Sequence, residues 1–166
     1  MNDLLMGLQD AIQQELVAYK DILSKAKQKK EALLKNDVAM LDRIVAHEGT
    51  IIKTVRELET QREGLIRAIA AEHGFDEKSV TLAEIAALFP EGREALLKLK
   101  SELARVLTEI ERLNAANKTL LDTHLQYSSF CINLLTGAAN TLNTYSYSGR
   151  ISDTQERMTL MLDRMV

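Results

Sequence analysis

The sequence is poor in the residues that build β-structure, loops and disulfides. Its 166 residues contain no tryptophan, one proline (Pro90) and one cysteine (Cys131), and aromatic residues make up 4%. Few aromatic residues and a single proline favour helices, and sequence signals for β-hairpins are nearly missing. One cysteine excludes an intramolecular disulfide and suits a reducing compartment. We therefore expect an all-α, cytoplasmic protein.

Neither charge of one sign nor a long apolar run dominates the chain. The 21 basic and 24 acidic residues are mixed along it and give a formal net charge of −3, so we expect no basic surface for nucleic acid. No run approaches the ~20 apolar residues that a membrane helix needs. Asp3, Gln9 and Asp10 interrupt any signal-peptide core. Nucleic-acid binding and membrane insertion are therefore not expected.

Residue patterns for enzyme chemistry are also scarce. None of His47, His73 and His124 has a glutamate three residues before it, as a di-iron helix bundle requires. His47-Glu48 lacks the second histidine of a zinc-protease helix, and the glycine fingerprints of nucleotide-binding loops are missing. His124 is two helical turns from Cys131, so we interpret this cysteine as a small buried apolar residue and not a nucleophile. We predict no enzymatic activity, no metal and no cofactor.

The second half of the sequence contains a heptad-like stripe of apolar residues. They recur at alternating spacings of three and four, and neither glycine nor proline lies between Gly92 and Gly137. This pattern predicts one very long helix with a single apolar seam. The seam consists of Leu96, Leu99, Leu103, Val106, Ile110, Leu113, Leu120, Tyr127, Cys131 and Leu134, with polar residues at Asn117 and His124.

Two more long helices are expected earlier in the chain, over residues 3–35 and 38–73. Both carry apolar stripes with the same rhythm, and Asn36-Asp37 separates them. Asparagine tolerates a left-handed conformation after a helix, and Asp37 is a good N-cap for the next one. So short a connection makes the two helices antiparallel.

Two capping boxes predict shorter elements. The run Thr81-Leu-Ala-Glu84 predicts a short helix over residues 82–88. A second box, Ser152-Asp-Thr-Gln155, precedes an amphipathic tail that is too short to be a stable helix without a partner. We thus expect an elongated antiparallel bundle of three long helices over residues 1–144, and a linker with an amphipathic tail helix over 145–166. The apolar face of the tail consists of Met158, Met161, Leu162 and Met165.

The expected helices differ in length. At equal rise per residue, the second helix covers the third only to about Tyr127. The stretch from Ser128 to about Ala139 then projects, and it includes Phe130, Leu134 and Leu135. Burying one leucine or phenylalanine side chain contributes about 1.5–3 kcal/mol, so a partner should cover this surface.

Three arrangements would cover it. In the first, the methionine face of the tail folds back over Phe130 and Leu134, either as a permanent fourth helix or in exchange with a partner. In the second, another copy of the chain covers the projecting stretch in a weak homodimer. In the third, a different protein covers it with an amphipathic helix. Because methionine faces repack easily, these arrangements can alternate. The sequence therefore favours a protein that binds a helix of another protein. The alternative is a structural coiled-coil protein that self-associates through its C-terminal region.

A series of residues along the whole chain supports the first function. Early members are Leu33, Asp37, Leu41, Lys53, Leu58, Arg62 and the run Thr81-Leu-Ala-Glu84. Later and more specific members are Asn114-Ala-Ala-Asn117, Leu120, Leu121, Tyr127, and Tyr145 with Gly149 four residues on. In this order they resemble the FlgN family of flagellar export chaperones over nearly the full length.

The resemblance implies a cytoplasmic chaperone that holds the C-terminal helical segment of its clients, the hook–filament junction (hook-associated) proteins, and delivers them to the flagellar type III export gate. In that family the C-terminal part binds the client, and a tyrosine in a Tyr-to-Gly turn docks at the gate. Tyr145 matches that tyrosine, although Ser146 follows where glycine is frequent and Tyr147 adds a second aromatic residue. We assign hydrophobic docking of the client to Phe130, Leu134 and Leu135, and exchange with the client to Met158, Met161, Leu162 and Met165.

Overall fold

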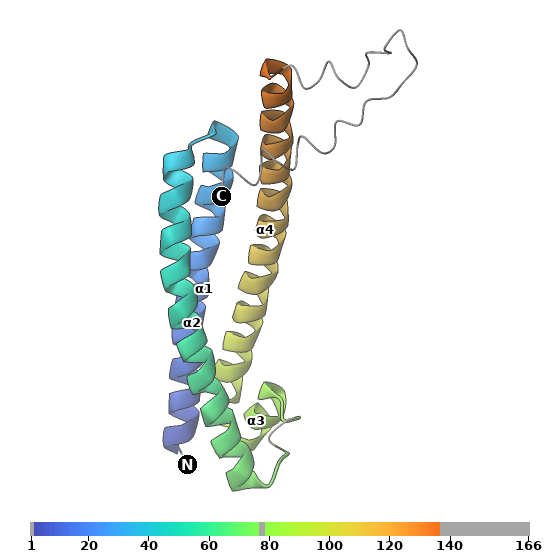
Figure 1. Cartoon of the computed structure of the whole chain (residues 1–166). Coiled ribbons are helices and arrows are strands. Elements are labelled where there is room, and N and C mark those ends of the chain that lie inside the picture. Colours follow the sequence, from blue (N-terminus) through green and yellow to red (C-terminus); the bar gives the residue numbers. More distant parts are fainter. Residues whose placement is uncertain (1, 77–78, 137–166) are drawn as a thin grey trace, which may run out of the picture. The chain divides into compact units, whose positions relative to one another are not determined.

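The computed structural model describes residues 2–76 and 79–136, and the described part of the chain contains helices and no strands (Figure 1). The elements are α1 (Asn2–Lys35), α2 (Val38–His73), α3 (Leu82–Leu88) and α4 (Arg93–Leu135). The all-α helical bundle is confirmed, and so is its short connector helix. The predicted tail helix lies outside the described residues.

The chain divides into two compact units, Met1–Leu121 and Asp122–Val166. The first unit holds α1, α2, α3 and the larger part of α4, and the described part of the second unit is residues 122–136. The division thus falls within α4. The boundary predicted between residues 144 and 145 lies outside the described residues.

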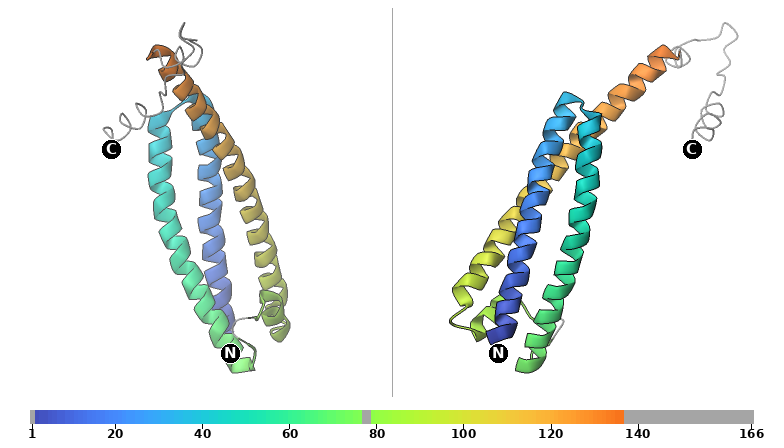
Figure 2. Two further views of the ribbon diagram at one scale, coloured as in Figure 1. Left: turned by 45° about the vertical axis from the view of Figure 1, so that its right-hand side comes forward. Right: turned by 90° about the vertical axis from the view of Figure 1, so that its left-hand side faces the viewer.

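The connection between α1 and α2 follows from two residues. Asn36 adopts the left-handed conformation, with φ of 53°, and ends α1. The Asp37 carboxylate then accepts a hydrogen bond from the Met40 backbone N–H at 2.9 Å, which caps α2. As predicted, the two helices return antiparallel and lie side by side (Figures 1 and 2).

The other end of α2 leads into α3 through two local signals. Gly74, with φ of 71°, ends α2 in the left-handed conformation that glycine favours. The predicted capping box is confirmed: the Thr81 N–H donates to Glu84 Oε2 at 2.7 Å, and the Glu84 N–H donates to Thr81 Oγ1 at 3.3 Å. The Thr81 hydroxyl also donates to Glu84 Oε2, at 2.8 Å, and this bond and the bond from the Thr81 N–H lower the pKa of the Glu84 carboxyl because both favour its charged form.

Pro90 lies in a turn that precedes α4. The Gly92 N–H donates to the Phe89 carbonyl at 3.1 Å, so residues 89–92 form a turn. Proline is favoured at the second position of such a turn because its φ is already fixed near the required value. The long helix therefore begins only at Arg93.

The core of the first unit consists of two clusters. The first joins all four helices through fully or almost fully buried side chains: Leu5, Leu8, Ile12, Ile69, Ile85, Ala86 and Leu96. The second joins α1 and α4 through Leu16, Val106 and Ile110, and partly buried residues such as Leu103 bridge the two clusters. The seam predicted on α4 is therefore buried in its first half.

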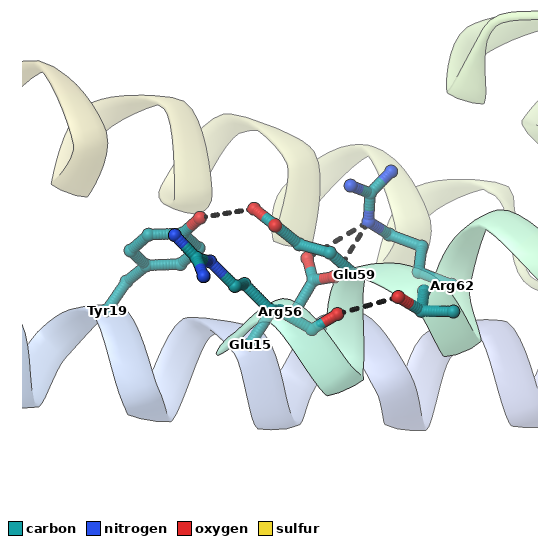
Figure 3. A network of polar contacts seen from close by, with 6 residues as sticks. Glu15, Tyr19, Arg56, Glu59 and Arg62 are labelled. Atoms are coloured by element: carbon teal, nitrogen blue, oxygen red, sulfur yellow. Dashed lines mark hydrogen bonds and ion pairs between the residues drawn. The ribbon is translucent and has the colours of Figure 1, made fainter. Parts of the chain in front are cut away.

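A polar network lies beside these clusters (Figure 3). Glu15, whose exposed fraction is 1%, accepts bonds from Arg62 Nε at 2.9 and 3.0 Å. Nearby, the Tyr19 hydroxyl donates to Glu59 Oε1 at 2.7 Å. Burial raises the pKa of Glu15, and the Arg62 charge opposes that shift. Both contacts join α1 to α2, so sliding one helix along the other would leave buried polar groups unpaired.

Asn117 is the last buried side chain of α4. Its Nδ2 donates to the Ala26 carbonyl at 2.9 Å, whereas its Oδ1 has no partner among the described residues. A buried amide in an apolar seam fixes the register of two helices at a cost in stability.

None of the helices in the described part of the chain is long and apolar enough to cross a membrane.

Candidate protein-binding surface

The apolar side chains of α4 change from buried to exposed after Asn117. Leu121 and Leu125 are 45% and 57% exposed, and Tyr127 is also exposed. Leu121 and Leu125 lie beside the predicted seam. On the seam itself Leu120 and His124 are still partly buried, and Tyr127, 68% exposed, is the first exposed residue after Asn117, so the seam becomes exposed about where the sequence had placed this change.

The three residues predicted to dock a client lie in the second unit, on what we term the apolar end of α4 (residues 122–135). Phe130 is 57% exposed, Leu134 is 55% exposed and Leu135 is 87% exposed. Monomeric proteins rarely leave so many large apolar side chains exposed in succession, unless the surface binds something. The client-docking role of these three residues stays a prediction.

The apolar end of α4 presents these side chains from a regular helix. Neither glycine nor proline interrupts residues 93–136. At the last turn, the backbone N–H and Oγ1 of Thr136 both donate to the Ile132 carbonyl, at 2.9 and 2.8 Å. The positions of the exposed residues around the helix axis therefore follow from their spacing.

The exposed residues form two stripes on different faces. Tyr127, Phe130 and Leu134, at i, i+3 and i+7, make one stripe, which continues the buried seam. A second stripe consists of Leu125, Ile132 and Leu135, and at 100° per residue its direction differs from that of the first by about 150°. Leu135 thus lies on a different face from Phe130 and Leu134, with which the sequence prediction had grouped it.

Only Leu135 of the second stripe was predicted to bind a client. Leu125 and Ile132 carried no assignment. Their spacing of seven residues, followed by Leu135 three residues later, is a helical periodicity visible in the sequence. A helix that is apolar on two faces is normally covered on both sides. The apolar end of α4 therefore exposes apolar side chains on two faces.

The apolar end of α4 has little capacity for chemistry. No group of three or more histidine, cysteine or acidic side chains that could hold a metal occurs in the part of the chain that the structure describes. Cys131 is partly buried and not fully buried as predicted, and a hydrogen bond with its thiol raises the pKa of the Tyr127 hydroxyl. This arrangement suits the burial of apolar surface.

The remaining predicted site residues lie outside the described residues. They are Tyr145, assigned to the export gate, and Met158, Met161, Leu162 and Met165, assigned to exchange with the client. Their roles stay predictions.

The described helices form a bundle whose last helix, α4, is buried in its first half and exposes apolar side chains at its end. The sequence model of the family described as FlgN protein matches residues 1–153. The chain therefore belongs to the FlgN family, whose members are flagellar export chaperones and not enzymes, and bind flagellar proteins.

One relative among curated proteins is an uncharacterized protein, YvyG, of Bacillus subtilis (strain 168). It is 28% identical over 132 residues, which cover 80% of this chain and 80% of that protein. No solved structure gives a significant match.

Proposed function

We propose that this protein is a cytoplasmic chaperone that binds the C-terminal helical segment of hook–filament junction proteins and delivers them to the flagellar type III export gate. The observation that carries the proposal is the apolar end of α4, with its exposed Phe130, Leu134 and Leu135, in a chain of the FlgN family. The chaperone catalyses nothing, because its work is to keep an apolar helix covered until export.

The client helix docks on the stripe of Tyr127, Phe130 and Leu134. Two of these residues are aromatic, and aromatic residues are enriched at the centres of protein interfaces. Each buried leucine or phenylalanine contributes about 1.5–3 kcal/mol. A regular helix holds them in fixed positions, so little conformational entropy of the chaperone is lost on binding.

The tail exchanges with the client. Residues 137–166 follow directly after the described end of the chain, and Met158, Met161, Leu162 and Met165 share one face of the predicted tail helix. Methionine side chains adapt to different partners, so the same face can cover the apolar end of α4 or contact a bound client. This exchange lets the chaperone stay covered before loading and after release.

Tyr145 docks at the export gate, with Tyr147 as the neighbouring aromatic residue. The family match, over residues 1–153, includes this segment. A tyrosine side chain offers a large, rigid contact surface with one polar end, which suits transient docking.

A binding assay with the full chain separates the two roles. Purified hook-associated proteins are captured on the immobilised chaperone, and a soluble domain of an export-gate component is then added. We expect truncation before Ser152 to weaken client capture, and Tyr145→Ala to retain the client but lose the gate component. Tyr147→Ala is the matched control, and loss of gate binding in that variant alone would move the assignment to Tyr147. Failure of the intact chain to capture any hook-associated protein would refute the proposal.

A structural coiled-coil protein that self-associates through its C-terminal region is the second candidate. The stripe of Leu125, Ile132 and Leu135 favours it, since two copies could cover each other there. Light scattering distinguishes the candidates: a tight dimer whose tail resists proteolysis supports self-association, and a monomer or weak dimer with a protease-sensitive tail supports the chaperone.

A further inference from the structure

Two hollows lie between α1 and α2, and neither includes a residue that the proposed function uses. The first, of about 430 Å³, has the buried Ile51 and Leu58 on its floor and the exposed Val17 at its rim. The second, of about 490 Å³, lies nearer the connection between the two helices and has the buried Ile44 on its floor.

The two hollows are parts of one groove, which we term the α1–α2 groove. On α1 the lining residues follow one face at alternating spacings of four and three: Gln14, Ala18, Asp21, Lys25 and Gln28. On α2 they do the same: Met40, Ile44, His47, Ile51, Thr54 and Leu58. Where the hollows meet, His47 Nε2 lies 3.1 Å from Asp21 Oδ2. From Gln14 to Gln28 the groove is about 21 Å long, which matches a helix of about 14 residues.

Helix α4 does not cover the α1–α2 groove. Helix α1 contacts α4 through Leu16, Lys20 and Ala26, none of which lines the groove. Along the groove, Val17 is 60% exposed and Thr54 is exposed as well. Within the described part of the chain the groove is thus open. A groove between two helices is a common site for an amphipathic helix of another protein.

The half of the groove near the connection between α1 and α2 is basic. Lys25 of α1 and Arg43 of α2 both line it, and neither forms an ion pair with a described residue. Asp37 also lines this half, but its carboxylate caps α2, and His47 is bonded to Asp21. Two cations are therefore left without an anion among the described residues, although the whole chain has a net charge of −3. A partner with acidic residues at this end would be electrostatically complementary.

We propose that the α1–α2 groove binds an amphipathic helix of another protein that is apolar along its length and acidic at one end. Its apolar residues cover Val17, Ile51 and Leu58, and its acidic residues pair with Lys25 and Arg43. The apolar half alone would accept any apolar helix, so the two cations select the partner and fix its direction. The groove shares no residue with the apolar end of α4 and is a second binding site beside that for the client.

Fluorescence anisotropy with two labelled, stapled helical peptides tests the proposal on the full chain. Both peptides are about 14 residues long with the same leucine face, and one ends in glutamates whereas the other ends in lysines. We expect the glutamate peptide to bind, and Arg43→Glu and Val17→Asp each to weaken it at least about tenfold. The matched controls are Arg56→Glu and Val45→Asp, at exposed α2 residues outside the groove, and both should bind like the parent chain.

A charge exchange tests the pairing at the basic end. Arg43→Glu should bind the lysine peptide at least about tenfold more tightly than the parent chain does. Leu134→Gln, which alters the surface proposed for the client, should keep the glutamate peptide, so this site and the client site can fail separately. Circular dichroism checks that all variants keep the helical content of the parent chain.

Three results would overturn the proposal. Equal affinity of the parent chain for the two peptides would remove the role of the cations, and an equal loss in Arg43→Glu and Arg56→Glu would remove the role of the groove. An intact chain that binds neither peptide would mean that no foreign helix docks there. In that case, binding gained on truncation before Ser152 would identify the tail as the occupant, and a dimer that Val17→Asp dissociates in sedimentation velocity would identify a second copy.

Discussion

The two halves of α4 carry similar apolar residues and differ in what covers them. Leu96 is fully buried and Leu113 is 4% exposed, whereas Leu134 and Leu135 are more than half exposed. Helical periodicity is the same in both halves, so it does not cause the difference. In the first half other helices of the first unit bury the seam, so removing one of its apolar side chains should destabilise the fold. In the second half the described residues leave the same kind of side chain exposed.

The largest effect on stability is expected in the buried half. Leu96→Ala removes a side chain that packs among all four helices and should lower the free energy of unfolding by about 3–5 kcal/mol. Urea denaturation followed by circular dichroism measures it. Leu34→Ala, at a 62% exposed leucine of α1, is the control and should cost less than about 1 kcal/mol. Equal losses in the two variants would show that burial does not separate these residues.

The next effect concerns the polar network beside the core. Arg62→Ala leaves the Glu15 carboxylate buried without its partner and should cost about 2–3 kcal/mol at neutral pH. Burial already raises the pKa of Glu15, so the folded state binds a proton more readily than the unfolded state does. The folded state is therefore stabilised as the pH falls toward the ordinary pKa, and the cost of Arg62→Ala should shrink in acid.

Urea denaturation at pH 7 and at about pH 5 measures this dependence. Arg112→Ala removes an exposed i,i+3 pair with Glu109 and serves as the control, with no change expected at either pH. A cost of Arg62→Ala that grows in acid would contradict this account of the network.

A smaller effect of opposite sign is expected where burial ends. Asn117→Leu removes the bond to the Ala26 carbonyl but also removes a buried oxygen without a partner. Burying the unpaired oxygen costs as much as the hydrogen bond contributes, or more, so the free energy of unfolding of the variant should rise by up to about 1 kcal/mol. Thermal denaturation of the variant and the parent chain measures the difference. A loss of more than about 1 kcal/mol would show that the bond stabilises the fold.

The smallest effect on stability is expected at the apolar end of α4. Phe130→Gln should change the free energy of unfolding by less than about 0.5 kcal/mol, because the described residues do not bury this side chain. The same urea denaturation measures it. A loss above about 1 kcal/mol would mean that the free protein already covers the surface, and the contrast between the two halves would fail.

Local sequence signals predicted the helix ends well. Asn36 and Asp37 end one helix and cap the next, and the capping box of Thr81 and Glu84 starts α3. These features depend on neighbours within four residues, so the sequence contains nearly all of their physical causes. The turn at Pro90 was not predicted, because proline suits both a helix start and a turn.

Contacts between helices were harder to predict. The sequence does not show that Arg62 lies against Glu15, nor that Asn117 is the last buried side chain of α4, because both depend on how helices far apart in sequence pack. The second stripe on the apolar end of α4 was visible as a period but gave no reason to prefer it over the seam. The exposure of Val45 and Ile52 on α2 was not predicted for the same reason, since both residues match the pattern of an ordinary buried face.

The affinity for a client helix tests the central claim most directly. Isothermal titration measures binding of the C-terminal helical segment of a hook-associated protein to the intact chain, to Leu134→Gln and to Leu34→Gln. The two leucines are 55% and 62% exposed, so the variants differ mainly in which surface they alter. We predict that Leu134→Gln weakens binding by about tenfold or more while Leu34→Gln binds like the parent chain. Equal affinities for both variants would contradict the account.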